Sequence, residues 1–464
     1  MRRRLSFLIL IFALKLFAQE KADSSAVMKQ ILDRLDSLEK QNRDLLQEVH
    51  ALRQQVEAAH PAEASSPGAS VAKQSPPAPG AAGQAGLGER VSVEESRTAE
   101  QAQTKVEAAH KFPIQLDGML LFNAFSNTGN YAEYAASNEY GPLTGPNTAG
   151  ATFRQTLLGL QFQGPSLPGD GHINGSLMMD FWGGSSDPQS HWLRLRHADI
   201  SLDWKNRSLS FRQDKPLISP YQPDSLAEVG IPPLSGAGNL WLWLPQVRYE
   251  ERLHFDASTG LTGQVALLET RETSALLPSS YLNSLEPSRP ALEGRFAFWH
   301  KFDDTRRVEV APGFHLSTSH VAGASVDSHI ASLDWQIIPA SHLQFSGTVF
   351  EGQNVAGLGS LGNGFTIAAN GVVRPVKSSG GWAQVAIPIT NRLTFNVYSG
   401  LESDNGANIY APYIVRNLSY ASNVMYHLGP NVIVSVEGMQ SRLRSFSGTE
   451  QTLNHYDLAV GYLF

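Results

Sequence analysis

The last nine residues of the chain alternate between two kinds of side chain. One parity is apolar or aromatic throughout, and the other holds Asp, Ala and Gly before Leu463; the first set is Tyr456, Leu458, Val460, Tyr462 and Phe464. A period of two indicates a β-strand with one apolar face. An apolar outer face ending in an aromatic is typical of the wall of a transmembrane β-barrel, although an edge strand of a soluble sandwich would alternate in the same way. In such barrels the terminal strand is recognised by the outer-membrane assembly machinery, so Tyr462 and Phe464 are the candidate assembly signal.

From residue 112 onward the same pattern breaks the chain into sixteen candidate strands. Their spans are 113–126, 152–163, 171–182, 192–204, 207–214, 240–255, 260–270, 291–302, 306–318, 326–338, 342–352, 380–389, 392–402, 410–427, 431–442 and 451–464. Short connections such as 205–206 and 390–391 alternate with long ones such as 215–239 and 353–379. Short periplasmic turns and long external loops in alternation are typical of outer-membrane barrels, and a sandwich has no reason to keep that order. We therefore predict that residues 112–464 form an all-β domain, a 16-stranded antiparallel transmembrane barrel (porin).

Two local patterns refine this prediction. Aromatic residues near the expected strand ends are assigned to interfacial girdles; they are Trp204, Trp241, Trp243, Tyr249, Tyr413 and Tyr462. In the strand expected at 192–204 the apolar parity switches between Leu195 and Ile200, which we interpret as a β-bulge.

The first residues have the pattern of a secretory signal peptide. Arg2, Arg3 and Arg4 precede an apolar run of about 13 residues, which is shorter than the ~20 that a membrane-spanning helix needs. We expect a signal peptide at 1–19. No later stretch is continuously apolar for ~18 residues, which argues against a helical membrane protein.

Residues 24–57 show heptad spacing and are expected to form a coiled-coil stalk, connected by an Ala/Pro/Gly-rich disordered linker at 58–111. The expected a and d positions are Met28, Ile31, Leu35, Leu38, Asn42, Leu45, Val49, Leu52 and Val56. Val at a, Leu at d and one Asn at a favour two strands, whereas porin-like barrels are usually trimers. The two arguments give different oligomer numbers, and we expect a homotrimer.

Composition narrows the possible functions. The chain has no Cys and a net charge of −7, which excludes a disulfide framework and gives no indication of nucleic-acid binding. No Gly-x-Ser-x-Gly, His-Glu-x-x-His or Walker motif is present, and the 14 His residues share no metal-ligand spacing. We therefore expect no enzyme activity, no cofactor and no metal.

Sixteen strands leave an aqueous lumen, and the long connection at 215–239 is the candidate constriction loop. Fifteen of the 21 Lys and Arg residues of the barrel domain lie between Arg154 and Arg307. The candidate pore-lining residues are Arg194, Arg196, Arg212, Lys215, Asp224, Glu228, Arg248, Glu250 and Arg252. An arginine strip would favour anions, because pore charge sets selectivity. Equally, these arginines could pair with Glu250, Asp199 or Asp214 and only brace the wall.

The chain resembles the DcaP-like outer-membrane porins, which join a periplasmic coiled coil to a trimeric 16-stranded barrel. The resemblance rests on two segments, Phe153-Arg154-Gln155-Thr156-Leu157-Leu158-Gly159-Leu160 and Leu193-Arg194-Leu195-Arg196-His197-Ala198. Phe211-Arg212-Gln213-Asp214 stands where the family often has Gly-Gln, and Arg212 replaces that Gly. The resemblance implies uptake of small organic anions such as dicarboxylates.

These features predict an outer-membrane porin, a passive diffusion channel for small hydrophilic solutes, with its stalk in the periplasm. The alternative is a structural anchor in which the stalk tethers the outer membrane to the periplasm or the cell wall. Eight strands would suffice for an anchor, and the two functions differ in conductance. The expected partners are outer-membrane lipid, further copies of the chain and the assembly machinery.

Overall fold

The structure is a computed structural model that describes residues 114–128, 147–184, 191–368, 370–409 and 413–464. The expected signal peptide (1–19), stalk (24–57) and linker (58–111) lie outside the described residues, and so do all the expected coiled-coil core positions. Within the described ranges, no helix is both long enough and apolar enough to cross a membrane.

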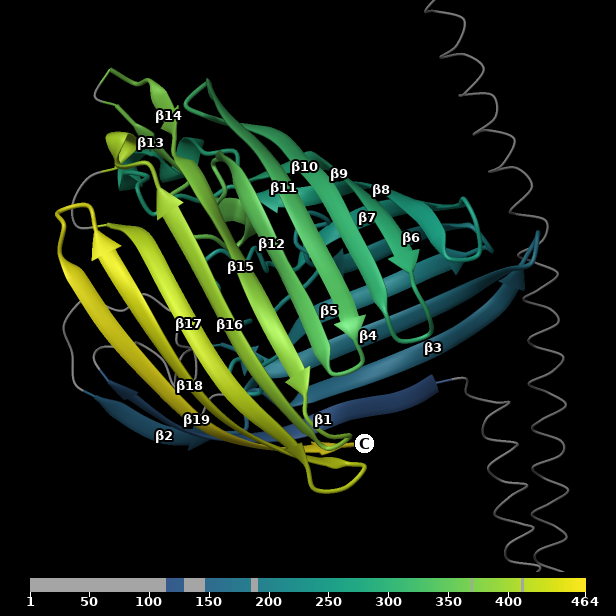
Figure 1. Cartoon of the computed structure of the whole chain (residues 1–464). Helices are drawn as coiled ribbons and strands as arrows, with labels where there is room; N and C mark the ends of the chain where they lie inside the picture. The colour runs from purple at the N-terminus through teal and green to yellow at the C-terminus, as the bar shows by residue number, and fades with distance from the viewer. Residues whose placement is uncertain (1–113, 129–146, 185–190, 369, 410–412) are drawn as a thin grey trace, which may run out of the picture. The chain divides into compact units, whose positions relative to one another are not determined.

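The described residues form one closed antiparallel sheet (Figure 1). Its strands are β1 (Ile114–Thr128), β2 (Thr148–Thr152), β3 (Leu157–Leu167), β4 (Gly171–Gly183), β5 (Trp192–Asp203), β6 (Arg207–Asp214), β7 (Leu244–His254), β8 (Thr259–Arg271), β9 (Ser288–Lys301), β10 (Arg307–Val321), β11 (Ala324–Ala340), β12 (Leu343–Gln353), β15 (Lys377–Pro388), β16 (Leu393–Asp404), β17 (Ile414–His427), β18 (Val432–Ser445) and β19 (Glu450–Leu463). Apart from β2 and β3, each pairs with its neighbours along the chain, and β19 returns to pair with β1. Because β2 and β3 both pair with β1, they form one interrupted wall strand, and the barrel has sixteen. The predicted fold class is confirmed.

The structure differs from the predicted strands in several places. The second predicted strand, 152–163, is broken at 153–156 into β2 and β3. Strands β10 and β11 run on into a tight turn at Ala322 and Gly323, whose φ angles of 48° and 83° are those of a two-residue hairpin turn. A small hairpin of β13 (Phe365–Ile367) and β14 (Val373–Pro375) lies within the loop between β12 and β15, as does the short 3-10 turn η2 (Ala356–Leu358).

The two faces of the wall differ as the alternation predicts. Along β19, Tyr456, Leu458 and Val460 are exposed on the outer face, while Leu453, His455 and Asp457 are buried on the inner one. In β5 the parity switch is a bulge: Met178 pairs with His197 and the next residue, Met179, pairs with Leu195, so Arg196 is the extra residue. The bulge predicted between Leu195 and Ile200 is confirmed.

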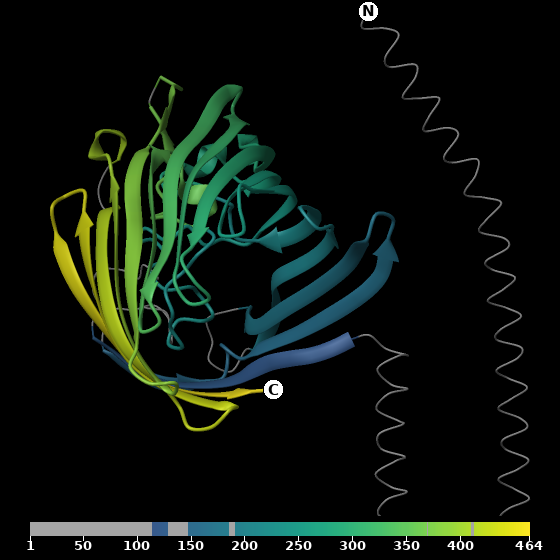
Figure 2. The ribbon, with the colours of Figure 1, turned by 45° about the vertical axis from the view of Figure 1, so that its right-hand side comes forward.

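The loop between β6 and β7, residues 215–243, runs inside the barrel and is called the inner loop below (Figure 2). Its apolar side chains pack against the inner wall on several sides. Leu234 and Ala237 contact Trp382 and Tyr398 of β15 and β16, and Leu226 packs beside Leu121 of β1. The inner loop is therefore held in the lumen by its own hydrophobic contacts.

The assignment of Trp241 and Trp243 to an interfacial girdle is wrong. The predicted strand 240–255 begins only at Leu244, so both tryptophans belong to the inner loop. Trp241 packs against the cluster of Phe125, Trp182 and Ile231, and the two indole rings meet edge to face at 5.1 Å. Because the inner loop turns into the closed barrel, this aromatic pair packs inside the lumen and not at the membrane interface.

Candidate functional site

The predicted basic residues lie on the inner face of β5, β6 and β7, which are consecutive in the wall. Alternation places Arg212 on the inner side of β6, and Arg248 and Arg252 on that of β7, because their neighbours Phe211, Val247 and Leu253 are exposed outward. We call the set Arg194, Arg196, Arg212, Lys215, Arg248 and Arg252 the basic wall.

Asp180 of β4 binds the two arginines that β5 contributes to the basic wall. Its carboxylate accepts from Arg194 Nη2 at 2.6 Å and Nε at 3.1 Å, and Arg196 Nη1 lies 3.5 Å away. Arg194 also donates to the carbonyl of Gly230 in the inner loop. Trp243 lies under both guanidinium groups, with its ring centre 5.1 Å from Arg194 and 4.6 Å from Arg196. The alternation along β4 could have predicted Asp180 as a site residue, because it is an acidic residue on the inner face. No sequence pattern predicts that Trp243 lies at this site.

Asp214, at the end of β6, lies between the arginines that β6 and β7 contribute to the basic wall. Arg212 bridges Asp199 at 2.8 Å and Asp214 at 3.2 Å, and Arg248 lies 3.8 Å from Asp214. Arg248 also donates to Gln246 Oε1 at 2.9 Å. These arginines therefore pair with wall carboxylates, as the bracing alternative expects.

Lys215 begins the inner loop directly beyond β6 and makes no side-chain hydrogen bond or ion pair with the described residues. Burial lowers the pKa of its ammonium group to about 8, against the opposing attraction of Asp214 and with a smaller contribution from Arg196. Its charge is therefore sensitive to pH just above neutrality.

Glu250 and Arg252 form the lower pair of the wall. Arg252 Nε donates to Glu250 Oε1 at 2.6 Å, and Gln264 of β8 donates to the other carboxylate oxygen at 2.7 Å. The Arg252 side chain is 37% exposed, the largest value among the paired arginines of the basic wall.

The ion pairs leave the basic wall with an excess of positive charge. Five arginines pair with the four carboxylates of Asp180, Asp199, Asp214 and Glu250, Lys215 pairs with none of the described residues, and Glu293 of β9 adds one further attraction at Arg248. Several of these arginines are also partly exposed, so their charge is not enclosed in protein. The arginines of the basic wall can thus pair with wall carboxylates and still leave positive charge facing the lumen.

The acidic residues of the inner loop lie away from the basic wall. Asp224 accepts from Gln384 of β15 at 2.6 Å, and its carbonyl accepts from Asn423 of β17 at 2.8 Å. Glu228 is buried, and its backbone N–H donates to Ser225 Oγ at 3.2 Å. The structure therefore does not bring Asp224 and Glu228 together with the arginines.

Gln155, in the break between β2 and β3, makes hydrogen bonds to the inner loop. Gln155 Nε2 donates to the Ala227 carbonyl at 2.7 Å, and Gln155 Oε1 accepts from the backbone N–H groups of Val229 at 2.6 Å and Gly230 at 2.7 Å. Arg154 is buried beside it, with its guanidinium 4.5 Å from the Trp182 ring centre. Sequence reasoning assigned this motif to a strand and missed its contact with the loop.

The far side of the inner loop is also anchored to charged wall residues. Tyr221 OH donates to Glu309 of β10 at 2.8 Å, and the Leu217 N–H donates to Glu293 of β9 at 2.6 Å. Arg295 binds Asp334 and Glu309 at 2.7 Å each. These acidic partners were not among the predicted site residues, because a sequence pattern does not show which wall strand a loop will meet.

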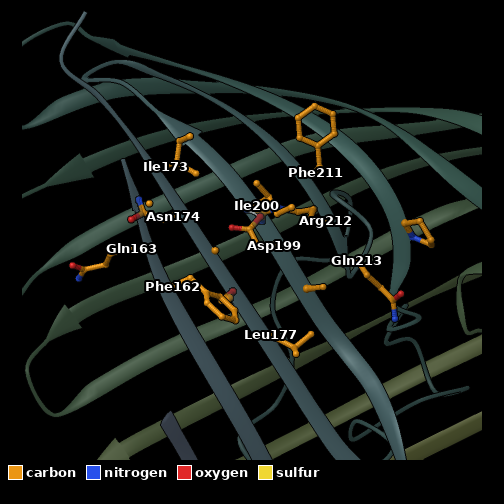
Figure 3. Close-up of a pocket in the computed structure, with 15 residues that line it drawn as sticks. Phe162, Gln163, Ile173, Asn174, Leu177, Asp199, Ile200, Phe211, Arg212 and Gln213 are labelled. Carbon is orange, nitrogen blue, oxygen red and sulfur yellow. Dashed lines mark ion pairs between the residues drawn. The ribbon is translucent and has the colours of Figure 1, made fainter. Parts of the chain in front are cut away.

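The outer face behind the basic wall is apolar. A groove of about 580 Å³ lies there. Figure 3 shows Phe162, Ile173, Ile200 and Phe211 around it, with Asp199 and Arg212, which form an ion pair, on the same strands. Alternation thus gives β3–β7 one membrane-compatible face and one charged face.

Tyr462 and Phe464 lie on the outer face at the seam of the barrel. They are 50% and 43% exposed, and Phe464 exchanges two backbone hydrogen bonds with Gly118 of β1, at 3.1 and 3.2 Å. Gly118 leaves room for the Phe464 ring, since a Cβ there would lie 2.8 Å from it. Both residues are accessible on the surface where a recognition signal would have to be.

The barrel is similar in fold to solved outer-membrane channels. It matches the outer membrane channel DcaP of Acinetobacter baumannii with a TM-score of 0.62 and 17% identity, over 76% of this chain and 97% of that chain. It also matches an anion-selective porin from Comamonas acidovorans with a TM-score of 0.51 and 10% identity, over 76% of this chain and 99% of that one. The sequence matches no protein-family model and no curated protein. The resemblance to DcaP-like porins expected from the sequence is confirmed for the fold.

Proposed function

We propose that this protein is an outer-membrane porin, a passive channel for small hydrophilic solutes that favours small organic anions such as dicarboxylates. The observation that carries the proposal is the excess of positive charge on the basic wall, where five arginines and Lys215, which pairs with no described residue, face four paired carboxylates and, near Arg248, Glu293. Fixed charge in a narrow lumen selects against ions of the same sign. The similarity of the fold to an anion-selective porin supports the same assignment.

The mechanism is diffusion along the basic wall. An anion entering the barrel meets the partly exposed guanidinium groups of Arg194, Arg212 and Arg252, each already held by a carboxylate. Binding therefore stays weak, as conduction requires, because each site must release the solute as readily as it binds it. The inner loop narrows the lumen, where it is fixed by its hydrogen bonds to Gln155 and Gln384 and also contacts the basic wall at Arg194.

The proposal includes an exported homotrimer with its stalk in the periplasm. A cleaved signal peptide at 1–19 and a coiled coil at 24–57 are its sequence basis. Membrane lipid, the other two copies and the assembly machinery are its partners, and no enzyme activity is part of it.

The test is the reversal potential and unit conductance of the full-length protein in planar bilayers under a KCl gradient, repeated with potassium succinate. Anion preference and conductance in triplet steps are expected. The double variant Arg248→Gln, Arg252→Gln should reduce the anion preference, whereas Lys301→Gln with Arg392→Gln, two exposed basic residues at the turn end of the barrel, should leave it unchanged. Cation preference would refute the anion assignment, and absence of conductance would favour the structural anchor.

A further inference from the structure

A row of polar residues crosses the outer face of the barrel near its loop end. Cross-strand pairing aligns Glu351, Ser379, Ser403, Arg416, Arg444 and Glu450, from β12 to β19. Their inner neighbours Glu402, Asn417 and Leu443 are buried, so alternation points the row outward. Polar residues on this face need a reason, because the face otherwise meets lipid.

The centre of this row is basic, and Glu450, the cross-strand partner of Arg444, is the acidic residue next to it. Arg416 and Arg444 are direct cross-strand partners, and like charges in that relation destabilise a sheet unless an anion lies between them. Neither guanidinium forms a hydrogen bond or ion pair with the described residues. Lys377 extends the basic patch on β15, and Arg442 extends it on β18, where it donates to Tyr420 OH at 3.0 Å. The acidic residues of the same row are Glu351 and Glu450, so the patch keeps an excess of two positive charges.

The position of the row along the barrel corresponds to the headgroup level of the outer leaflet. Along the outer face of β19, the apolar residues between Tyr462 and Tyr456 give way to Asn454, Thr452 and Glu450. Ten residues separate Tyr462 from Thr452, the partner of Arg442, and at ~3.3 Å per residue and ~40° tilt they span about 25 Å; Glu450 of the row lies two residues, about 5 Å, beyond that level. That is the height of the apolar band of such barrels, ~25 Å.

A groove leads from the basic patch into the apolar band. Its upper part, of about 350 Å³, is lined by Glu351, Lys377, Ser379, Ser403 and Asp404, whose carboxylate accepts from Ser378 and Asn363. Its lower part, of about 470 Å³, is lined mainly by apolar and small residues, among them Trp335, Val349, Gly381, Ala383 and Leu401. Ser379 and Ser403 line both parts, so the groove is continuous, and Ser403 is the cross-strand neighbour of Arg416.

We propose that this surface binds a phosphate-bearing lipid of the outer leaflet. One acyl chain lies in the lower groove, and a phosphate group lies between Arg416 and Arg444, within reach of Lys377. The planar guanidinium fork matches phosphate geometry, and the anion relieves the repulsion between the two arginines. The site faces outward, so it is separate from the proposed channel, although it rests on the membrane location in the proposed function.

The test is native mass spectrometry of the full-length protein titrated with bisphosphorylated lipid A. The double variant Arg416→Gln, Arg444→Gln should weaken binding about 30-fold, which corresponds to about 1 kcal/mol for each charge near a membrane surface. Lys301→Gln with Arg392→Gln removes the same charge at the opposite end of the barrel and should change binding by less than about twofold.

A second variant separates lipid from free phosphate and from a second copy of the chain. Ala383→Trp fills the lower groove without altering the charge, and it should also weaken lipid A binding by about fivefold or more, because an acyl chain then loses its apolar contacts. Unchanged binding in this variant would refute the acyl-chain site and leave a phosphate site only. If the variants change the number of chains per complex and not the number of bound lipids, the surface is a subunit interface and the proposal is wrong. Conductance is not part of this readout, so the lipid site and the channel can fail independently.

Discussion

The side-chain amide of Gln155 donates a hydrogen bond of 2.7 Å to the backbone carbonyl of Ala227. The amide oxygen of the same side chain accepts from the backbone N–H groups of Val229 and Gly230. The side chain thereby satisfies three backbone groups of the inner loop from a break in the wall. Each of these groups would otherwise be unpaired in a buried setting. Gln155 thus fixes the position of the inner loop, and the position of this loop sets the width of the lumen.

Replacing Gln155 by Leu is expected to loosen the inner loop. Three hydrogen bonds at roughly 1 kcal/mol each give a loss of about 3 kcal/mol in the free energy of holding the loop. Single-channel recordings should show larger and noisier conductance. Gln161→Leu is the matched control, because Gln161 lies on β3 and, among the described residues, its side chain donates only to Asp117. Equal noise in both variants would contradict the role of Gln155.

The anion preference of the channel should fall as pH rises from about 7 to about 9. Lys215 is cationic below its pKa of about 8 and neutral above it, so one positive charge leaves the basic wall in this range. Reversal potentials measured across the range report the change. Lys215→Arg should keep the anion preference at the alkaline end, and Lys215→Gln should show the low preference already at neutral pH. A pH response that persists in both variants would assign it to another group.

Asp180→Asn should make the lumen more anion-selective and the protein less stable. The carboxylate is buried and neutralises Arg194 and Arg196 together, so its loss leaves two guanidinium groups without a counter-charge. Breaking such a buried pair costs about 3 kcal/mol. Reversal potential and thermal unfolding measure the two effects. Asp203→Asn serves as the control, because within the described part of the chain the Asp203 carboxylate accepts only from Ser201 and Asn174.

Phe464→Ala is expected to lower the amount of barrel assembled in the outer membrane. The ring is exposed at the seam, and the backbone bonds to Gly118 do not need it. Refolding of the purified variant into detergent should therefore proceed nearly as in the wild type. If refolding fails to the same degree as assembly in cells, Phe464 acts by closing the seam and is not an assembly signal. Heat-modifiable migration on gels measures the folded fraction in both settings.

Local pattern alone determined the wall of this protein. The alternation in β7 and β19 and the short turns at residues such as Asn206 and Asn391 are properties of neighbouring residues, and they are sufficient to predict the strand number, the outward face and the bulge in β5. The inward orientation of Arg212, Arg248 and Arg252 follows from the same parity. Gln155 escaped prediction, because its function depends on a loop more than seventy residues away.

Only the tertiary structure decided which groups meet inside the barrel. Asp180 reaches Arg194 and Arg196 because β4 and β5 are adjacent, and Trp243 joins them because the inner loop turns inward before β7 begins. The same loop carries Asp224 to β15 and β17, far along the sheet order from the basic wall. A strand's period is set by its own backbone, but the path of a long loop is set by the sum of its contacts with a closed wall, which no local pattern contains.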